Sequence, residues 1–307
     1  MPDFLDIFFL QQLLNGLSVG LVYALVAIGF TLIFGVLNVV NFAHGEIYML
    51  GAYAGLVAIA TLAPPFAVVL LLAAAAGAFL GCGLERIAFK PFRRFRDEAS
   101  LKSKAVREAT LMSSLAVSII VREVTEKVFG GDMQIVPPAY RLQEPIAIGE
   151  LIVIDGQLWI LGAAVLMYAA LQYILFRTDV GLSIRAIASN PLGAQMVGIN
   201  VDRTVLATFA IGSLMGAIAG ILIGLYLADI TPHMGFGPGV KAFVAMVMGG
   251  LSSIPGAVVC AIFLGVMEAV ATEFIAQGWS ELVAYFFLVV TLVFFPTGLF
   301  GAGRERV

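Results

Sequence analysis

The sequence VLATFAIGSLMGAIAGILIGLYL, residues 205–227, contains no charged residue. A helix of this length, at about 1.5 Å per residue, crosses the roughly 30 Å hydrocarbon core of a membrane. Small residues recur at every fourth position and so fall on one helix face, which permits close contact with another helix: Gly212, Gly216, Gly220 and Gly224. This stretch therefore predicts a membrane-spanning helix packed tightly inside a bundle.

The whole chain has the composition of an integral membrane protein. Of its 307 residues, 61% are hydrophobic and 12% are charged, and the mean hydropathy is +1.03. The weak alternation of a transmembrane β-barrel is not seen. We expect an all-α, polytopic transmembrane helix bundle that forms a single domain over residues 1–307, with about eight spans: 11–35, 45–62, 66–86, 109–129, 157–176, 205–227, 255–275 and 281–300.

One apolar piece, residues 240–251, is too short to be a ninth full span. Its segment Lys241 to Gly250 would be roughly 15 Å long as a helix, about half of a bilayer. Such a broken or re-entrant half-helix is tolerated where protein or a water-filled path lines it. Similar small-residue rows, at Gly77 and Gly81 and at Ala257 to Ala269, predict further close helix contacts.

Basic residues in short loops predict the sidedness of the chain. The loop 86–108 is rich in Arg and Lys and should be cytoplasmic, whereas 130–156 is acidic and should face outward. The loop 177–204 then lies inside. Acidic residues at the start and basic residues at the end of the chain predict an outside N-terminus and an inside C-terminus, which together require an odd number of crossings.

The inward loop contains GLSIRAIASNPLGAQMVGINVDR, residues 181–203, which is more ordered than a plain connection. Arg185–Ser189 is expected to form a short helix. Asn190 can cap the next helix, Pro191 suits its first position and Gly198 suits a left-handed stop. Two short helices on a membrane surface indicate a contact with another molecule.

Several polar groups in apolar surroundings are candidates for a translocation path, because charges are costly there: Asn41, His44, Glu46, Lys241 and Glu268. The first three belong to the segment NFAHGE. They have an alternative role as helix caps and packing groups at the start of the second span. A metal site is disfavoured, since His44 and Glu46 do not share a helix face, and we predict none. The charged residues 122–127 are expected to form solvated pairs at the outer interface.

The absence of certain catalytic and nucleotide-binding motifs limits the classes of protein to which the chain can belong. The sequence has no G-x-x-x-x-G-K-[ST] phosphate loop, no H-E-x-x-H and no G-x-S-x-G. We therefore predict a chain that is not an enzyme. A secondary transporter with a coupling-ion site and a permease driven by separate ATPases both remain open.

Four stretches resemble the branched-chain amino acid permeases of ABC importers of the LivH type. They are LVAIGFTLIFGVLNVVNFAHGEIYMLG at 25–51, RAIASNPLGAQMVGINVDR at 185–203, KAFVAMVMGGLSSIPGA at 241–257 and FPTGLFG at 295–301. Permeases for urea and short amides are similar, so these substrates remain alternatives, as does an ion-coupled secondary transporter.

The resemblance implies an importer in a bacterial inner membrane, with the present chain as a multi-pass subunit. Its expected partners are a second permease of the LivM type, two cytoplasmic ATPase subunits and a periplasmic binding protein. No cofactor is expected in this chain, because ATP and Mg would be bound by the ATPase subunits. In such importers an inward loop docks on an ATPase subunit and couples it to the permease. The resemblance assigns this role to residues of the loop 181–203: Arg185, Ala186, Asn190, Pro191, Gly193, Gly198, Ile199 and Asn200.

Overall fold

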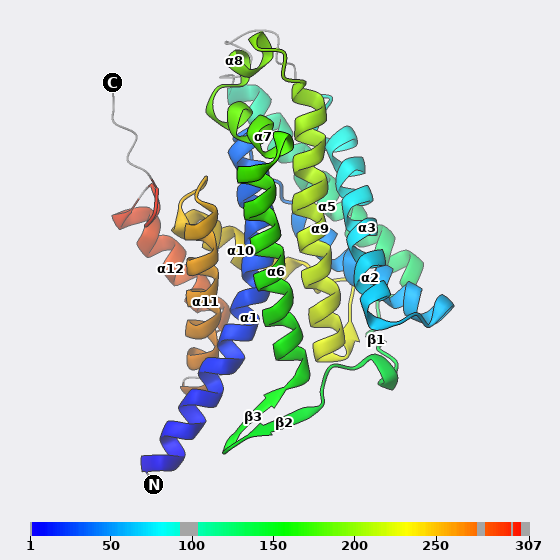
Figure 1. Cartoon of the computed structure of the whole chain (residues 1–307), viewed down its shortest axis with the longest axis vertical. Coiled ribbons are helices and arrows are strands. Elements are labelled where there is room, and N and C mark those ends of the chain that lie inside the picture. Colours follow the sequence, from blue (N-terminus) through cyan, green and yellow to red (C-terminus); the bar gives the residue numbers. More distant parts are fainter. Residues whose placement is uncertain (1, 93–103, 275–279, 296, 302–307) are drawn as a thin grey trace.

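The computed structural model of the chain describes residues 2–92, 104–274, 280–295 and 297–301. Half of the basic residues in the loop 86–108, and the two arginines near the C-terminus, lie outside these ranges. The described residues form an all-α bundle, as predicted (Figure 1). Its long helices are α1 (Pro2–Leu37), α2 (His44–Leu62), α3 (Phe66–Leu84), α5 (Lys104–Phe129), α6 (Asp155–Arg177), α9 (Val201–Leu227) and α11 (Ile254–Phe274).

Shorter elements lie between and beside the long helices. The short helices are η1 (Glu85–Phe89), η2 (Pro138–Tyr140), α7 (Asp179–Ser189), α8 (Pro191–Met196), α10 (Phe236–Gly249) and α12 (Ser280–Phe294). Two small antiparallel pairs join β1 (Gln134–Ile135) to β4 (Asp229–Ile230) and β2 (Pro145–Ile148) to β3 (Leu151–Ile154). The β2–β3 hairpin and the start of α1 lie at one end of the bundle, and α7 and α8 lie at the other (Figure 1). The segments expected to be outside and inside are thus at opposite ends.

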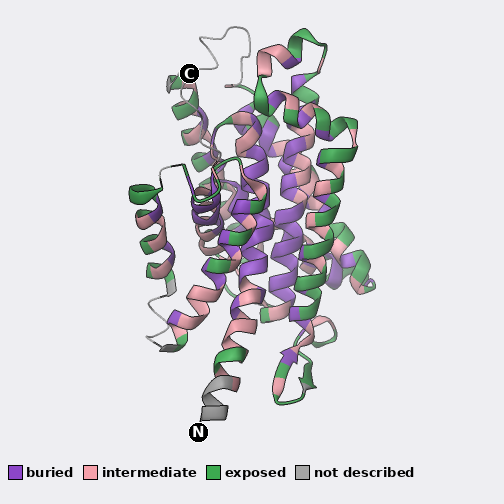
Figure 2. Ribbon diagram, turned by 60° about the vertical axis from the view of Figure 1, so that its left-hand side comes forward, coloured by how far each residue is buried: buried purple, intermediate pink, exposed green. Residues whose placement is uncertain are grey.

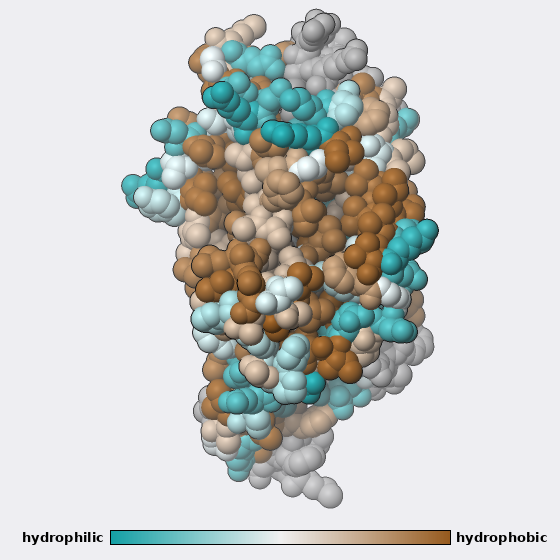
Figure 3. All heavy atoms as spheres, turned by 90° about the vertical axis from the view of Figure 1, so that its right-hand side faces the viewer, coloured by the Kyte–Doolittle hydropathy of each residue, from teal (hydrophilic) through white to brown (hydrophobic). Residues whose placement is uncertain are grey.

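Within the described residues, six helices are long and apolar enough to cross a membrane. Hydrophobic residues cover the middle of the face in Figure 3, and hydrophilic ones gather near its ends. The span expected at 109–129 corresponds to α5, which is not among the six because charged residues lie toward both of its ends. The largest differences from the expected span boundaries are at the first and the last span. The first helix begins at Pro2. The last ends at Phe294, two positions before a proline in the sequence, and proline and the residue before it both disfavour a helix.

The short segment expected at 240–251 is α10, a 14-residue helix of about 21 Å, too short to cross the bilayer. Gly250 ends it with a φ of +101°. The amide of Leu299 then donates to the Met248 carbonyl at 2.7 Å, so the last described residues close the end of the half-helix. This satisfies one of the backbone carbonyls that a helix end leaves free.

Helix α9 is mostly buried and contacts α1, α2 and α3. Buried residues fill the middle of the bundle (Figure 2). The predicted glycine row of α9 makes the contacts with α1 and α2, and the predicted pair Gly77 and Gly81 makes the contact with α3. A Cβ at Gly212 would lie 3.2 Å from the Gly29 carbonyl of α1, and one at Gly220 would overlap the Tyr48 carbonyl of α2. The small-residue row of α11 packs this helix onto α1, where a Cβ at Gly265 would overlap the backbone of Gly20. The close contacts expected from the sequence are confirmed.

Replacing Gly220 by Ala should destabilise the protein, because the new methyl group has no room beside the backbone of α2. The expected loss is about 1–3 kcal/mol, as for other overpacked positions. The melting temperature of the purified protein in detergent measures it. Gly162→Ala, on α6 with open space around its Cβ position, is the matched control and should not lower stability. Equal melting temperatures for the two variants would contradict the role of Gly220.

Candidate functional site

The turn from α6 to α9 contains three successive helix caps. The side-chain oxygens of Thr178, Asn190 and Asn200 accept hydrogen bonds from backbone N–H groups three residues further on, at 3.2, 2.9 and 3.0 Å. The predicted cap at Asn190 is confirmed. The helix expected at Arg185–Ser189 is longer, because Thr178 caps it and starts it at Asp179. The caps at Thr178 and Asn200 were not predicted, although both residue types favour this position.

One side of this turn packs against the helix bundle and the other side is exposed. Ile184, Ile187 and Ala194 are buried against the bundle, while Met196 and Val197 are 88% and 77% exposed. We call residues 179–200 the α7–α8 surface. Exposed apolar residues on a well-capped turn are typical of a contact site for another protein.

The predicted coupling residues are distributed over this surface in two groups. Those with exposed side chains or backbone are Arg185, Asn190, Gly198 and Asn200, and those partly buried are Ala186, Pro191, Gly193 and Ile199. Gly198 has a φ of +86°, which confirms the expected left-handed stop. The Arg185 guanidinium lies 4.8 Å from the centre of the Phe176 ring, which holds it against α6.

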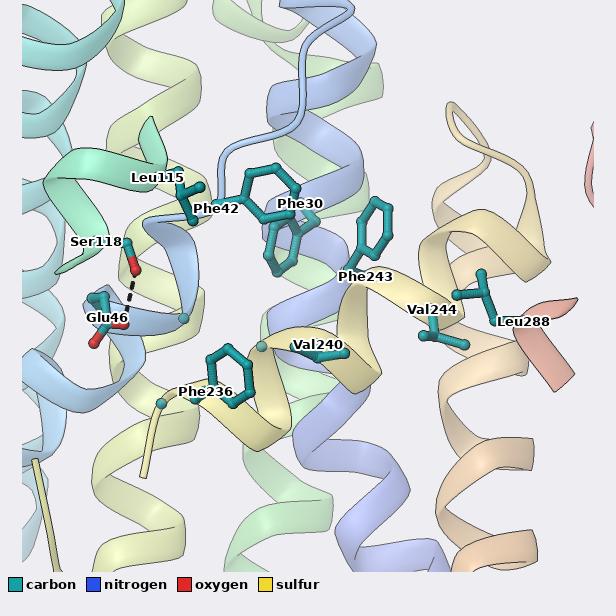
Figure 4. Close-up of a pocket in the computed structure, with 13 residues that line it drawn as sticks. Phe30, Phe42, Glu46, Leu115, Ser118, Phe236, Val240, Phe243, Val244 and Leu288 are labelled. Atoms are coloured by element: carbon teal, nitrogen blue, oxygen red, sulfur yellow. Dashed lines mark hydrogen bonds between the residues drawn. The ribbon is translucent and has the colours of Figure 1, made fainter. Parts of the chain in front are cut away.

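A cavity of about 230 Å³ lies within the bundle, between α1, α2, α5, α10 and α12 (Figure 4). Phe30, Phe42, Phe236 and Phe243 make much of its wall. Valine and leucine side chains from α5, α10 and α12 complete its apolar part. Because one water needs only about 10–15 Å³, the cavity has room for a small organic molecule.

One wall of the cavity is polar. Ser118 of α5 donates a hydrogen bond to Glu46 Oε1 at 2.9 Å, and both residues line the cavity (Figure 4). Arg122, one turn beyond Ser118, and His233 act on Glu46 electrostatically from further away. His233 Nε2 also lies 3.8 Å from a carboxylate oxygen of Glu126. Arg122 and Glu126 of α5 thus act on residues of other segments, Glu46 and His233, whereas we expected pairs within 122–127.

Asn41 and His44 lie away from this cavity. The Asn41 side chain accepts a hydrogen bond from the Ala43 amide at 3.1 Å, just before α2 begins. His44 is fully buried, with its ring 4.8 Å from that of Phe30 and close to the Val26 carbonyl. Gly29 and Gly216 make room for it. His44 and Glu46 point to different sides of α2, as their spacing predicted.

Lys241 and Glu268 form an ion pair between α10 and α11. Tyr23 of α1 completes the group: it donates to Glu268 Oε2 at 2.9 Å and accepts from the Lys241 ammonium at 3.2 Å. The side chains of the pair are only 13% and 17% exposed, and neither lines the Phe-rich cavity. Tyr23 and Ser118 were missed from the sequence, because a single hydroxyl in an apolar span carries no pattern.

Removing one charge of the Lys241–Glu268 ion pair should strongly destabilise the protein. Lys241→Met leaves the Glu268 carboxylate without its counter-charge, at an expected cost of about 3–5 kcal/mol. The double variant Lys241→Met, Glu268→Gln removes both charges and should recover most of the loss. Thermal unfolding of the purified proteins compares the two, and a single variant as stable as the double would contradict the prediction.

A multi-helix membrane bundle with an apolar pocket between its helices is the architecture expected of a transport permease. A family model described as "Branched-chain amino acid transport system / permease component" matches residues 12–293, and the chain belongs to this family. It is similar to the high-affinity branched-chain amino acid transport system permease protein LivH of Salmonella typhimurium, with 33% identity and coverage of 96% of each chain.

Two further relatives extend the similarity to other organisms. The high-affinity branched-chain amino acid transport system permease protein BraD of Pseudomonas aeruginosa is 33% identical, over 95% of this chain and 96% of its own. The probable branched-chain amino acid transport permease protein LivH of Methanocaldococcus jannaschii is 27% identical, over 92% of this chain and 90% of its own. The resemblance drawn from the four sequence stretches is therefore confirmed over nearly the whole chain.

Proposed function

We propose that this chain is one translocating subunit of an ATP-driven importer for branched-chain amino acids in a bacterial inner membrane. The observation that carries the proposal is the 33% identity to LivH, a branched-chain amino acid permease, over 96% of both chains. The Phe-lined cavity fits an apolar side chain, which favours branched-chain amino acids over urea or short amides. The family match favours an ABC importer over an ion-coupled secondary transporter.

The chain requires other subunits for this function. The sequence has no phosphate-binding loop, so ATP and Mg would be bound by two cytoplasmic ATPase subunits. A second permease of the LivM type would complete the pore, and a periplasmic binding protein would deliver substrate at the end that carries the β2–β3 hairpin. Co-purification of the ATPase subunits with the tagged chain tests the ATP-driven part of the proposal.

The ATPase subunits would dock on the α7–α8 surface. Its exposed Met196 and Val197 supply an apolar contact, and its capped helices supply a rigid one. The path residues Asn41, His44, Glu46, Lys241 and Glu268 would act further inside. Of these, Glu46 lines the cavity, whereas the others would hold the surrounding helices in place.

Asn190→Ala should uncouple ATP hydrolysis from transport. Loss of the cap weakens the start of α8 by about 1 kcal/mol, so the docked turn transmits less of the ATPase movement. We expect uptake per ATP hydrolysed to fall about fivefold in proteoliposomes. Ser252→Ala, at an exposed turn residue outside the α7–α8 surface, is the control. Unchanged coupling in the Asn190 variant would count against this docking site.

Substrate identity is best measured on the cognate binding protein. A thermal-shift screen should show stabilisation by leucine, isoleucine or valine and none by urea, because a bound ligand stabilises the folded state. Uptake of the same ligand by the reconstituted importer should require ATP. Stabilisation by urea alone would favour the short-amide alternative.

A further inference from the structure

A second cavity lies in line with the Phe-lined cavity. It measures about 340 Å³ and is lined by the end of α1, the first turns of α5 and the α1–α2 linker, residues 38–43. Phe34 of this cavity follows Phe30 by one turn of α1, and Leu111 precedes Leu115 by one turn of α5. Since residues four apart share a helix face, the two cavities succeed one another along a single groove between α1 and α5.

The second cavity is the polar, water-facing end of this groove. Asn38, Arg107 and Glu108 line it, and all three are exposed. Arg107 and Glu108 belong to the loop 86–108, which we expected to be cytoplasmic. The groove therefore leads from the apolar cavity within the bundle toward the inner side of the membrane.

Three phenylalanine rings separate the two cavities. The ring centre of Phe243 lies 6.4 Å from that of Phe30 and 6.2 Å from that of Phe42. Figure 4 shows these rings together at the end of the Phe-lined cavity that faces the α1–α2 linker, with Phe236 and Val240 toward the other end. A polar solute would lose its water among apolar rings, so such a constriction is a barrier to passage.

Phe42 is the member of this cluster that is least fixed by secondary structure. Phe30 and Phe243 belong to α1 and α10, whereas Phe42 lies in the α1–α2 linker, outside any helix. Its backbone N–H donates to Ser114 Oγ of α5 at 3.3 Å, and the residue is 42% exposed. Linker residues 38–40 also line the second cavity, so a shift of the linker would change both cavities at once.

We propose that this groove is the inner half of the translocation path and that Phe42 closes it. The ring of Phe42, against Phe30 and Phe243, keeps the two cavities apart. Movement of the linker away from these two rings joins the cavities and lets an apolar amino acid pass toward the cytoplasm. The inference rests on the proposed transport function and adds to it a route and the residue that blocks this route.

The test measures how fast a small, membrane-impermeant cationic thiosulfonate reaches the Phe-lined cavity from the cytoplasmic side. Val240→Cys places a thiol in this cavity, beyond the three rings (Figure 4), in a chain whose own cysteines are replaced by Cys82→Ala and Cys260→Ala. Inside-out vesicles that contain the complete importer, without ATP, present the cytoplasmic face to the reagent. Phe42→Ala should speed the labelling of this chain about tenfold, because loss of the ring opens a continuous route.

Phe79→Ala is the matched control, because it removes an exposed ring of α3 that lines neither cavity. It should leave the labelling rate unchanged, and Phe42→Trp, which keeps a ring in place, should keep labelling slow. Reaction in denaturant checks that the thiol is reactive in each variant. Size-exclusion chromatography checks assembly, and Phe42→Leu, which should speed labelling less, replaces an alanine variant that does not assemble.

Three results would each overturn the proposal. One is an unchanged labelling rate in the Phe42→Ala variant, or in the Phe42→Leu variant that replaces it. Another is an equal acceleration by Phe79→Ala, which would indicate a general loosening of the bundle. The third is labelling of the Phe42→Trp variant as fast as that of the Phe42→Ala variant.

ATP-driven leucine transport by the reconstituted importer separates this proposal from the proposed function. An importer whose labelling depends on Phe42 but that transports no leucine with ATP contradicts only the proposed function. ATP-driven leucine transport, together with labelling that is indifferent to Phe42, contradicts only the closure of the path by this residue.

Discussion

Contact between helix backbones at glycine is the interaction on which this fold depends. Lipid chains are as apolar as leucine, so burial of apolar surface supplies little drive for helices to associate inside a membrane. Close van der Waals contact has to replace it. The glycines of α9 allow α1 and α2 to approach it closely, and Gly77 and Gly81 of α3 allow the same for α3. The remaining helices pack around this group.

The polar groups buried in the bundle differ in how completely they are hydrogen-bonded. Tyr23, Lys241 and Glu268 satisfy one another and join three helices. Glu46 is held by Ser118 at one oxygen only. A satisfied network specifies how helices pack. Buried polar atoms without a hydrogen-bond partner also occur on Asn41, His44 and Tyr53, which do not line the cavity, so an unpaired buried atom does not by itself mark a ligand position.

Local chemistry explains which features were predictable from the sequence. The length of the apolar stretches predicted the helices, and the spacing of small residues predicted their close contacts. The Asn190-Pro191 pair predicted the start of α8. Each of these features depends on residues that are near one another in the sequence. The partners of Glu46 and Glu268 depend on how distant helices pack. Ser118 is 72 positions from Glu46 and Tyr23 is 245 from Glu268, so no local pattern connects them.

The three caps between α6 and α9 have a mechanical consequence. Because Thr178, Asn190 and Asn200 each fix a helix start, the turn has few free torsion angles in which an applied force can be absorbed. If the ATPase subunits dock there as proposed, a push on α8 would be carried into the axis of α9. The glycine contacts leave no clearance for that helix to slide past its neighbours alone. The group of α1, α2, α3 and α9 should therefore turn as one stiff body, and the volume of the cavity beside α1 and α2 should change with it.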